Sequence, residues 1–201
     1  MAPYLRASGG EWGTALALYD ANARVSAAFF ESIHYLEVGL RNAINDAVTA
    51  RLDPEWLTTG SPVLTANSRG VVATAQRHAG GPDASRDKVI AELPFGFWWS
   101  LLADEYNRRL WQPALRHAFE GSVRRRVLHA GLDEVRRLRN RIAHHEPIHT
   151  RDLATDYRRV VDIANRVGPA LGDHIAAISR VPALLLATTV EPGEAAGQVT
   201  G

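Results

Sequence analysis

A long stretch without proline, residues 12–52, occupies most of the first quarter of this 201-residue chain. Apolar side chains recur in it at spacings of three and four residues, the period of an α-helix that buries one face. They are Phe29, Phe30, Ile33, Leu36, Val38, Leu40, Ile44 and Val48. Asp53-Pro54 ends the stretch, because proline cannot continue a helix. The pattern predicts one or two long helices whose apolar face must be covered by the rest of the chain.

The rest of the sequence is also helical in its periodicity. Glycine, proline and capping residues divide it into further expected helices, over 66–78, from Asp83 or Ser85 to before Pro94, over 132–145, over 152–167, and from Gly168-Pro169 to about 179. Gly121 and Gly131 are expected to break helices. No alternating strand pattern or hairpin signature is present. The fold class is therefore predicted to be all-α.

The chain is expected to form one domain over residues 11–190. Residues 1–10 are interpreted as an N-terminal extension and 191–201, rich in Gly, Pro and Ala, as a flexible tail. No signal peptide is apparent, and the longest apolar run, 181–190, is shorter than the ~20 residues that span a bilayer. We expect a cytoplasmic protein with no membrane partner. The aromatic stretch 95–102 is interpreted as part of the core.

The chain has no cysteine, which removes disulfides, thiolate metal sites and cysteine nucleophiles. Nucleophile motifs of the Gly-x-Ser-x-Gly type and phosphate loops of the Gly-Lys-Ser/Thr type are also absent from the sequence. We therefore expect neither a cofactor nor a bound metal.

The net charge of +1 conceals an uneven distribution of arginine. Lys88 is the only lysine among 23 basic residues. From Arg116 to Arg141 the sequence contains eight arginines and only three acidic residues. Arginine binds phosphate through a planar fork of donors. The segment therefore supplies candidate RNA-binding residues: Arg124, Arg125, Arg126, Arg136, Arg137 and Arg141.

The same segment ends in Arg139-Asn140-Arg141-Ile142-Ala143-His144-His145. On a helical wheel Val135, Leu138 and Ile142 form a buried stripe, while one edge beside it presents Arg136, Arg139, Asn140 and His144. His145 falls on the opposite shoulder, which favours a packed, hydrogen-bonded structural role. The candidate catalytic residues are Arg139, Asn140, His144 and His145.

These residue types suffice for one particular reaction. Histidine takes and gives protons near neutral pH, and arginine neutralises charge that develops on phosphate oxygens. Asparagine orients either group by hydrogen bonding. RNA carries its own nucleophile, since its 2′-OH attacks the adjacent phosphate once a base removes its proton. The pattern therefore points to metal-free cleavage of RNA.

The residues 139–145 closely resemble the signature of HEPN-domain proteins, an arginine and a polar residue followed by a histidine. The Ala-His-His that follows Arg-Asn resembles the Abi-like branch, associated with abortive infection. Two further segments fit that branch: Glu37-Val38-Gly39-Leu40-Arg41-Asn42, and Phe95-Gly96-Phe97-Trp98 with Leu110-Trp111. The resemblance covers roughly residues 20–170.

This resemblance implies an HEPN-like helical bundle with additional helices, usually a homodimer in which two motif helices form one composite site. It implies a metal-independent endoribonuclease of the toxin or antiphage-defence type, with RNA as substrate and an antitoxin protein as a further partner. Carried over by position, Arg139 would bind phosphate, Asn140 would be the polar motif residue and His144 the catalytic histidine. His145 is the alternative.

Glu146 departs from the branch, because it places a negative charge where a basic and aromatic continuation is common. Either it points away or it restrains Arg139 until substrate arrives. A non-catalytic HEPN-like dimer that binds RNA or a partner protein is therefore the competing hypothesis. A metal site of His144, His145 and His149 is disfavoured, because adjacent histidines on one helix point about 100° apart.

Overall fold

The computed structural model describes residues 1–190, and within that range the chain is helical with no strand. The predicted all-α class is confirmed. The residues interpreted as a tail, 191–201, lie outside the described part of the chain.

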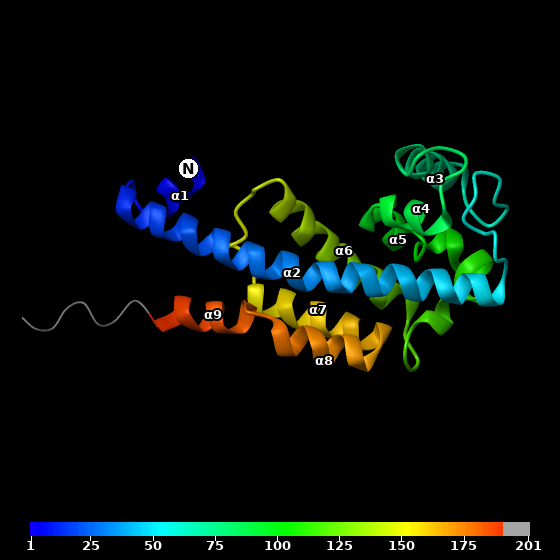
Figure 1. Cartoon of the computed structure of the whole chain (residues 1–201). Helices are drawn as coiled ribbons and strands as arrows, with labels where there is room; N and C mark the ends of the chain where they lie inside the picture. Colours follow the sequence, from blue (N-terminus) through cyan, green and yellow to red (C-terminus); the bar gives the residue numbers. More distant parts are fainter. Residues whose placement is uncertain (191–201) are drawn as a thin grey trace, which may run out of the picture.

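Helix α2 (Trp12–Arg51) is a single helix that runs the length of the molecule (Figure 1). Glu11 caps its start by accepting a hydrogen bond from Gly13 N at 2.8 Å. Its core-facing side, which includes Phe29, Ile33, Leu36, Leu40 and Ile44, is almost completely buried. The long helix expected from the proline-free stretch is therefore one element, and it serves as the axis of the fold.

Five helices pack along α2. They are α1 (Ala2–Ala7), α6 (Arg125–Ala143), α7 (Leu153–Val167), α8 (Pro169–Ile178) and α9 (Val181–Val190). In Figure 1, α6 lies on one side of α2, and α8 and α9 on the other. Helix α7 contacts both α6 and α8, so the core-facing side of α2 is covered along most of its length.

A smaller lobe covers the C-terminal end of α2 (Figure 1). It contains helices α3 (Ala66–His78), α4 (Arg86–Glu92) and α5 (Phe95–Ser100). The short 3₁₀-helix η1 (Asp104–Tyr106), the π-helix η2 (Asn107–Trp111) and the 3₁₀-helix η3 (Leu115–Ala118) follow. The predicted bounds of the first two helices are confirmed. Phe95, Phe97 and Trp98 are buried, which confirms the interpretation of the aromatic stretch as core.

The expectation that Gly131 breaks a helix is wrong. Helix α6 begins at Arg125, about two turns before the predicted start, and runs through Gly131 without interruption. A Cβ atom at Gly131 would lie 3.3 Å from Ile163 Cδ1 of α7. The glycine therefore lets α6 and α7 approach closely. Gly121 does lie in a loop, with a φ of +70° that favours glycine.

The C-terminal helices α8 and α9 are separated by Ser179 and Arg180. The stretch Pro169–Ala187 is long and apolar enough to cross a membrane by length and composition alone, which is weak evidence of a span. Ile175 and Val181 are nevertheless buried in the same core as the core-facing side of α2. Both helices therefore contribute apolar side chains to the packed bundle.

Candidate functional site

The arginine and histidine motif lies at the C-terminal end of α6. The last helical residue is Ala143, His144 is the cap, and the chain reverses through two hydrogen bonds. Glu146 N donates to Arg141 O at 2.8 Å, and His145 N donates to Ile142 O at 3.0 Å. This pair of bonds is the Schellman arrangement, which satisfies carbonyls at a helix end.

The Schellman arrangement forces His145 into a left-handed conformation, with a φ of 57°. Glycine usually occupies this position, because a side chain there costs on the order of 1 kcal/mol. His145 is exposed, and its side chain makes no hydrogen bond to the described residues. The prediction of a packed, hydrogen-bonded histidine is therefore wrong, since the helix ends two residues earlier than the wheel assumed.

Arg139 and His145 line one open cavity of about 580 Å³. Its other walls come from α1 and α2 and include Tyr4, Tyr19 and Phe30. His144 is also exposed but does not line this cavity. Asn140 is half-buried, and its backbone carbonyl accepts a hydrogen bond from His144 N at 3.0 Å. The structure thus brings Arg139 together with the second histidine of the pair rather than the first.

The arginines predicted to bind RNA differ in their ion pairs. Arg125 pairs with Asp104 at 2.5 Å, Arg136 with Asp133 at 2.7 Å and Arg137 with Asp133 at 2.9 Å. Arg124, Arg126 and Arg139 have no ion pair with any described residue. An unpaired guanidinium keeps its full charge for an anionic ligand, so Arg139 is the motif residue best suited to bind a phosphate.

Glu146 lines the same cavity but pairs with another arginine. Its carboxylate lies 3.5 Å from Arg141 Nε, and Arg141 Nη2 also donates to the Pro147 carbonyl at 2.8 Å. Arg141 is therefore held at the helix end by local partners. Glu146 forms no ion pair with Arg139 in the described part of the chain, so restraint of Arg139 by Glu146 is not seen, although the carboxylate does line the cavity.

Arg139 lies beside the α2 segment that carried part of the family resemblance. Burial raises the pKa of the Glu37 carboxyl, and the charges of Arg139, Arg41 and His34 offset part of this increase. The Nε atoms of Arg139 and Arg41 are buried without a hydrogen-bond partner among the described residues. Two segments more than ninety residues apart in sequence therefore meet in one partly buried charged cluster.

Arg136 belongs to a different group, built on the aromatic stretch. Its guanidinium lies 4.5 Å from the centre of the Trp99 ring, which stacks on His129 with centroids 4.7 Å apart. Burial is the main cause of a lowered pKa of His129. The contact with Trp99 joins α6 to α5, and the ion pair with Asp133 of α6 occupies the same guanidinium, so Arg136 is not available to a ligand in this arrangement.

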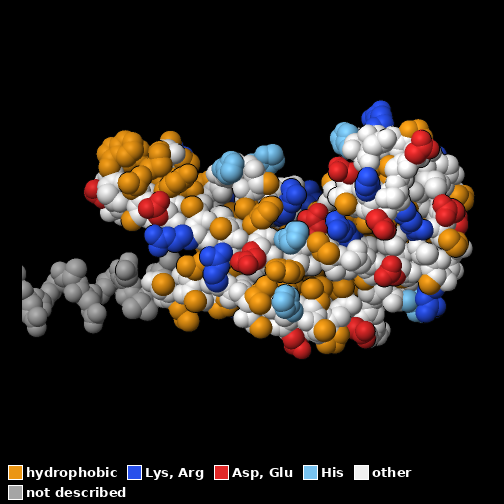
Figure 2. Space-filling view, viewed as in Figure 1, with side chains coloured by type: hydrophobic (Ala, Val, Ile, Leu, Met, Phe, Trp, Pro, Cys, Tyr) orange, Lys and Arg blue, Asp and Glu red, His pale blue; other side chains and the backbone are white. Residues whose placement is uncertain are grey.

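Exposed apolar side chains flank the cavity along the first half of α2. Trp12, Leu16, Tyr19 and Phe30 are each between 44% and 63% exposed. Figure 2 shows hydrophobic side chains gathered at the end of the molecule formed by α1 and the start of α2, next to histidines over the end of α6. We call Trp12, Leu16, Tyr19 and Phe30 the apolar stripe of α2. Several large apolar side chains exposed along one helix are typical of an interface.

Sequence reasoning missed the arginines of α7. Arg158, Arg159 and Arg166 line a second and larger hollow, between α6 and α7, together with Arg124. Their spacing of seven and eight residues puts them on related faces of a helix, and this signal was available in the sequence. In the part of the chain that the structure describes, no group of three His, Asp or Glu side chains is arranged to hold a metal ion.

No protein-family model, curated protein or solved structure matches this chain. We therefore infer its function from the residues of the site and from the resemblance of residues 139–145 to the HEPN signature.

The left-handed conformation of His145 gives a stability prediction. We expect His145→Gly to increase the free energy of unfolding by about 1 kcal/mol, because glycine adopts this φ without strain. Urea denaturation followed by circular dichroism measures the change. The matched control is His144→Gly, one residue earlier at φ −94°, which should lower stability by about 0.5–1 kcal/mol. Equal effects of both substitutions would contradict the strain argument.

Glu37 gives a prediction about pH. A carboxyl whose pKa is raised on folding destabilises the folded state once it ionises, so its unfavourable effect is absent at low pH and grows as pH rises through the raised value. We expect Glu37→Gln to increase the melting temperature at pH 7 and to leave it unchanged near pH 4. Asp46→Asn, an exposed change on the same helix, serves as the control. A melting temperature that falls at pH 7 would show that the electrostatic attraction of Arg139 and Arg41 for the Glu37 carboxylate outweighs the effect of burial.

Proposed function

We propose that this protein is a metal-independent endoribonuclease of the HEPN-like, Abi-like type, acting in the cytoplasm as a toxin or in antiphage defence. The observation that carries the proposal is that an arginine without an ion pair, Arg139, and an exposed histidine, His145, line one open cavity. This is the pair that phosphodiester cleavage needs: a cation for the phosphate and a group that moves a proton.

The reaction uses the RNA as its own nucleophile. His145 removes the proton of the 2′-OH, and the 2′ oxygen forms a bond to the adjacent phosphorus. Arg139 stabilises the negative charge that develops on the non-bridging oxygens. The bond from phosphorus to the 5′ oxygen breaks, and a protonated histidine returns a proton to that oxygen. The products are a 2′,3′-cyclic phosphate and a 5′-OH end, without any oxidant or metal.

A second copy of the chain would complete this site. The reaction needs a base at the 2′ oxygen and an acid at the 5′ oxygen, and one histidine cannot serve both positions at once. A composite site supplies a second histidine as the acid. The family resemblance implies such a homodimer, and the apolar stripe of α2 beside the cavity supports it, because buried apolar area drives association. A protein antitoxin that covers this face would block the cavity.

Cleavage tests the assignment of roles. We expect purified protein to cleave single-stranded RNA in the presence of EDTA, and both Arg139→Ala and His145→Ala to slow cleavage at least about 100-fold. His144→Ala should retain more activity than His145→Ala, since His144 lies outside the cavity. Gel analysis of a labelled RNA, with enzymatic mapping of its new ends, measures rate and product.

The controls separate chemistry from folding. Arg77→Ala removes an exposed arginine of α3 that does not line the cavity, and it should retain most activity. Cleavage that survives both Arg139→Ala and His145→Ala would refute the proposal. Binding of RNA without any cleavage would favour the competing hypothesis of a non-catalytic HEPN-like module.

The dimer gives a separate prediction. Phe30→Asp places a charge in the apolar stripe and should convert a dimer to a monomer, with loss of cleavage, because burying an unpaired charge is costly. Light scattering coupled to size-exclusion chromatography measures the mass. Val127→Asp, at another exposed apolar residue, should leave the dimer intact. A wild-type chain that is monomeric at the concentrations used for cleavage would refute the composite site.

A further inference from the structure

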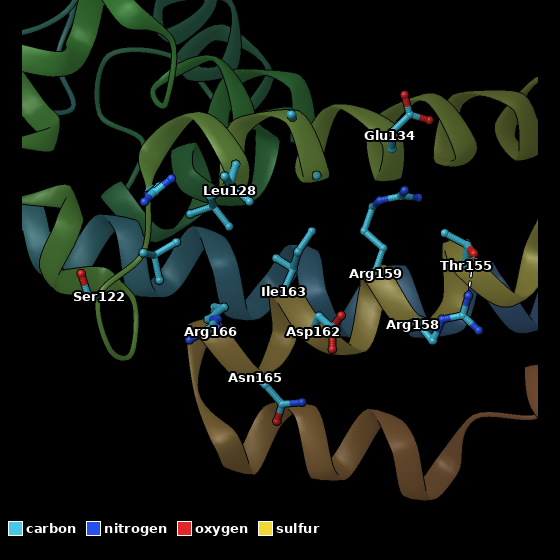
Figure 3. A pocket seen from close by; sticks show the side chains of 15 residues that line it. Ser122, Leu128, Glu134, Thr155, Arg158, Arg159, Asp162, Ile163, Asn165 and Arg166 are labelled. Carbon is cyan, nitrogen blue, oxygen red and sulfur yellow. Dashed lines mark hydrogen bonds between the residues drawn. The ribbon is translucent and has the colours of Figure 1, made fainter.

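A hollow larger than the motif cavity lies away from the motif. It is an open groove of about 960 Å³ between α6 and α7, shown in Figure 3. Leu128 and Ile163 form part of its apolar floor, and Val127, 65% exposed, lies at its edge. The loop before α6 closes one end, where Glu120 N donates to Arg166 O at 2.6 Å.

The groove contains arginines that form no ion pair with a described residue. Arg124, Arg158 and Arg166 are exposed, and none of them forms an ion pair with a described residue. Arg158 donates a hydrogen bond to Thr155 Oγ1 at 2.6 Å, which orients its guanidinium along the edge of the groove (Figure 3). These three arginines are the free cations of the groove.

The remaining charged residues of the groove do not cancel them. Arg159 is neutralised by buried Asp156 at 2.9 Å, and Glu134 is shared between Arg151 at 3.1 Å and Arg137 at 3.6 Å. Asp162 is the one other carboxylate among the groove residues. Three unpaired arginines and one aspartate leave a local net charge of +2.

The positive surface continues around the start of α6. Arg124 and Val127 also line an adjacent hollow of about 470 Å³, which includes Arg126 and Asn107. The first turn of α6 contains no acidic residue. The unpaired arginines therefore follow a path along the surface and do not converge on one point.

This spacing selects an extended ligand. Arg158 and Arg166 are eight residues apart on one helix, or about 12 Å along its axis, which is too far for a single phosphate to bridge. Guanidinium groups bind phosphate oxygens in pairs, and apolar floors accept sugars and base faces. A chain of phosphates linked by sugars fits these features, and a small phosphorylated metabolite does not.

We infer that the groove between α6 and α7 holds the sugar-phosphate backbone of an RNA strand through Arg124, Arg158 and Arg166. That the strand is RNA rather than DNA rests on the proposed function; the preference for a phosphate backbone rests on the groove alone. Leu128 and Arg139 are eleven residues apart on α6, about 16 Å, so the groove is a separate binding surface that captures substrate outside the cleavage cavity.

Salt dependence of binding tests this inference. The probe is fluorescein-labelled single-stranded poly(U), and the background is Arg139→Ala, which prevents cleavage during the measurement. Changing Arg124, Arg158 and Arg166 together to Gln should reduce the slope of log K against log salt by about 2, because each lost phosphate contact on a single strand changes it by about 0.7. Fluorescence anisotropy between low and physiological salt gives the slope.

The matched control changes Arg6, Arg77 and Lys88 to Gln. These three exposed cations lie on α1, α3 and α4 and carry the same total charge. The control should keep the wild-type slope, and unchanged melting temperatures should show that both triple variants fold. An equal loss in both variants, an unchanged slope in the groove variant, or no binding of poly(U) at low salt would overturn the inference.

The groove inference and the nuclease proposal can fail separately. If wild-type protein cleaves RNA while the groove variant keeps its slope, the groove inference fails and the nuclease proposal stands. If no RNA is cleaved while the groove variant loses slope, the groove is an RNA-binding surface and the nuclease proposal fails.

Discussion

Burial of one face of α2 is the constraint on which the rest of this fold depends. A forty-residue helix is not held together by propensity alone in water; it needs tertiary packing along its apolar face. Here that packing comes from helices that arrive late in the sequence, α6 to α9, and from the aromatic lobe around Trp98. The face that remains open, toward the start of α2, is where the motif cavity forms. Incomplete coverage of α2 thus creates the candidate site.

Two polar contacts then place the histidine turn against α2. The side-chain oxygen of buried Asn22 accepts hydrogen bonds from Ile148 N at 2.8 Å and His149 N at 3.2 Å. Arg151, a few residues further, donates to buried Asp156 of α7 at 2.7 Å and pairs with Glu134 of α6. Since both ends of these contacts are at least partly withdrawn from water, losing either would leave unsatisfied polar groups. The segment after His145 is therefore tied to three helices.

Local patterns in the sequence predicted the helices well and the ends of α6 poorly. Gly80-Gly81-Pro82 and Pro94 mark real boundaries because glycine and proline act through the backbone alone. The role of Gly131 could not be predicted from local sequence, because it depends on Ile163 of a helix that is distant in sequence. The turn at His145 could not be predicted either, because a helix wheel assumes that the helix continues, whereas the chain reverses into a left-handed conformation. His145, expected to be packed, is therefore exposed and lines the cavity.

Composition alone does not show which arginines of the arginine-rich segment are available to a ligand. All six arginines proposed to bind RNA share one stretch of sequence, yet ion pairs with Asp104, Asp133 and Glu146 occupy four of them. An arginine held by a carboxylate must exchange that partner before it binds a phosphate, while an unpaired arginine does so without loss. Which arginines are free to bind a ligand therefore depends on the ion pairs that form in the tertiary structure. By that criterion Arg139 serves the cavity, and Arg124 joins arginines of α7 that the motif did not include.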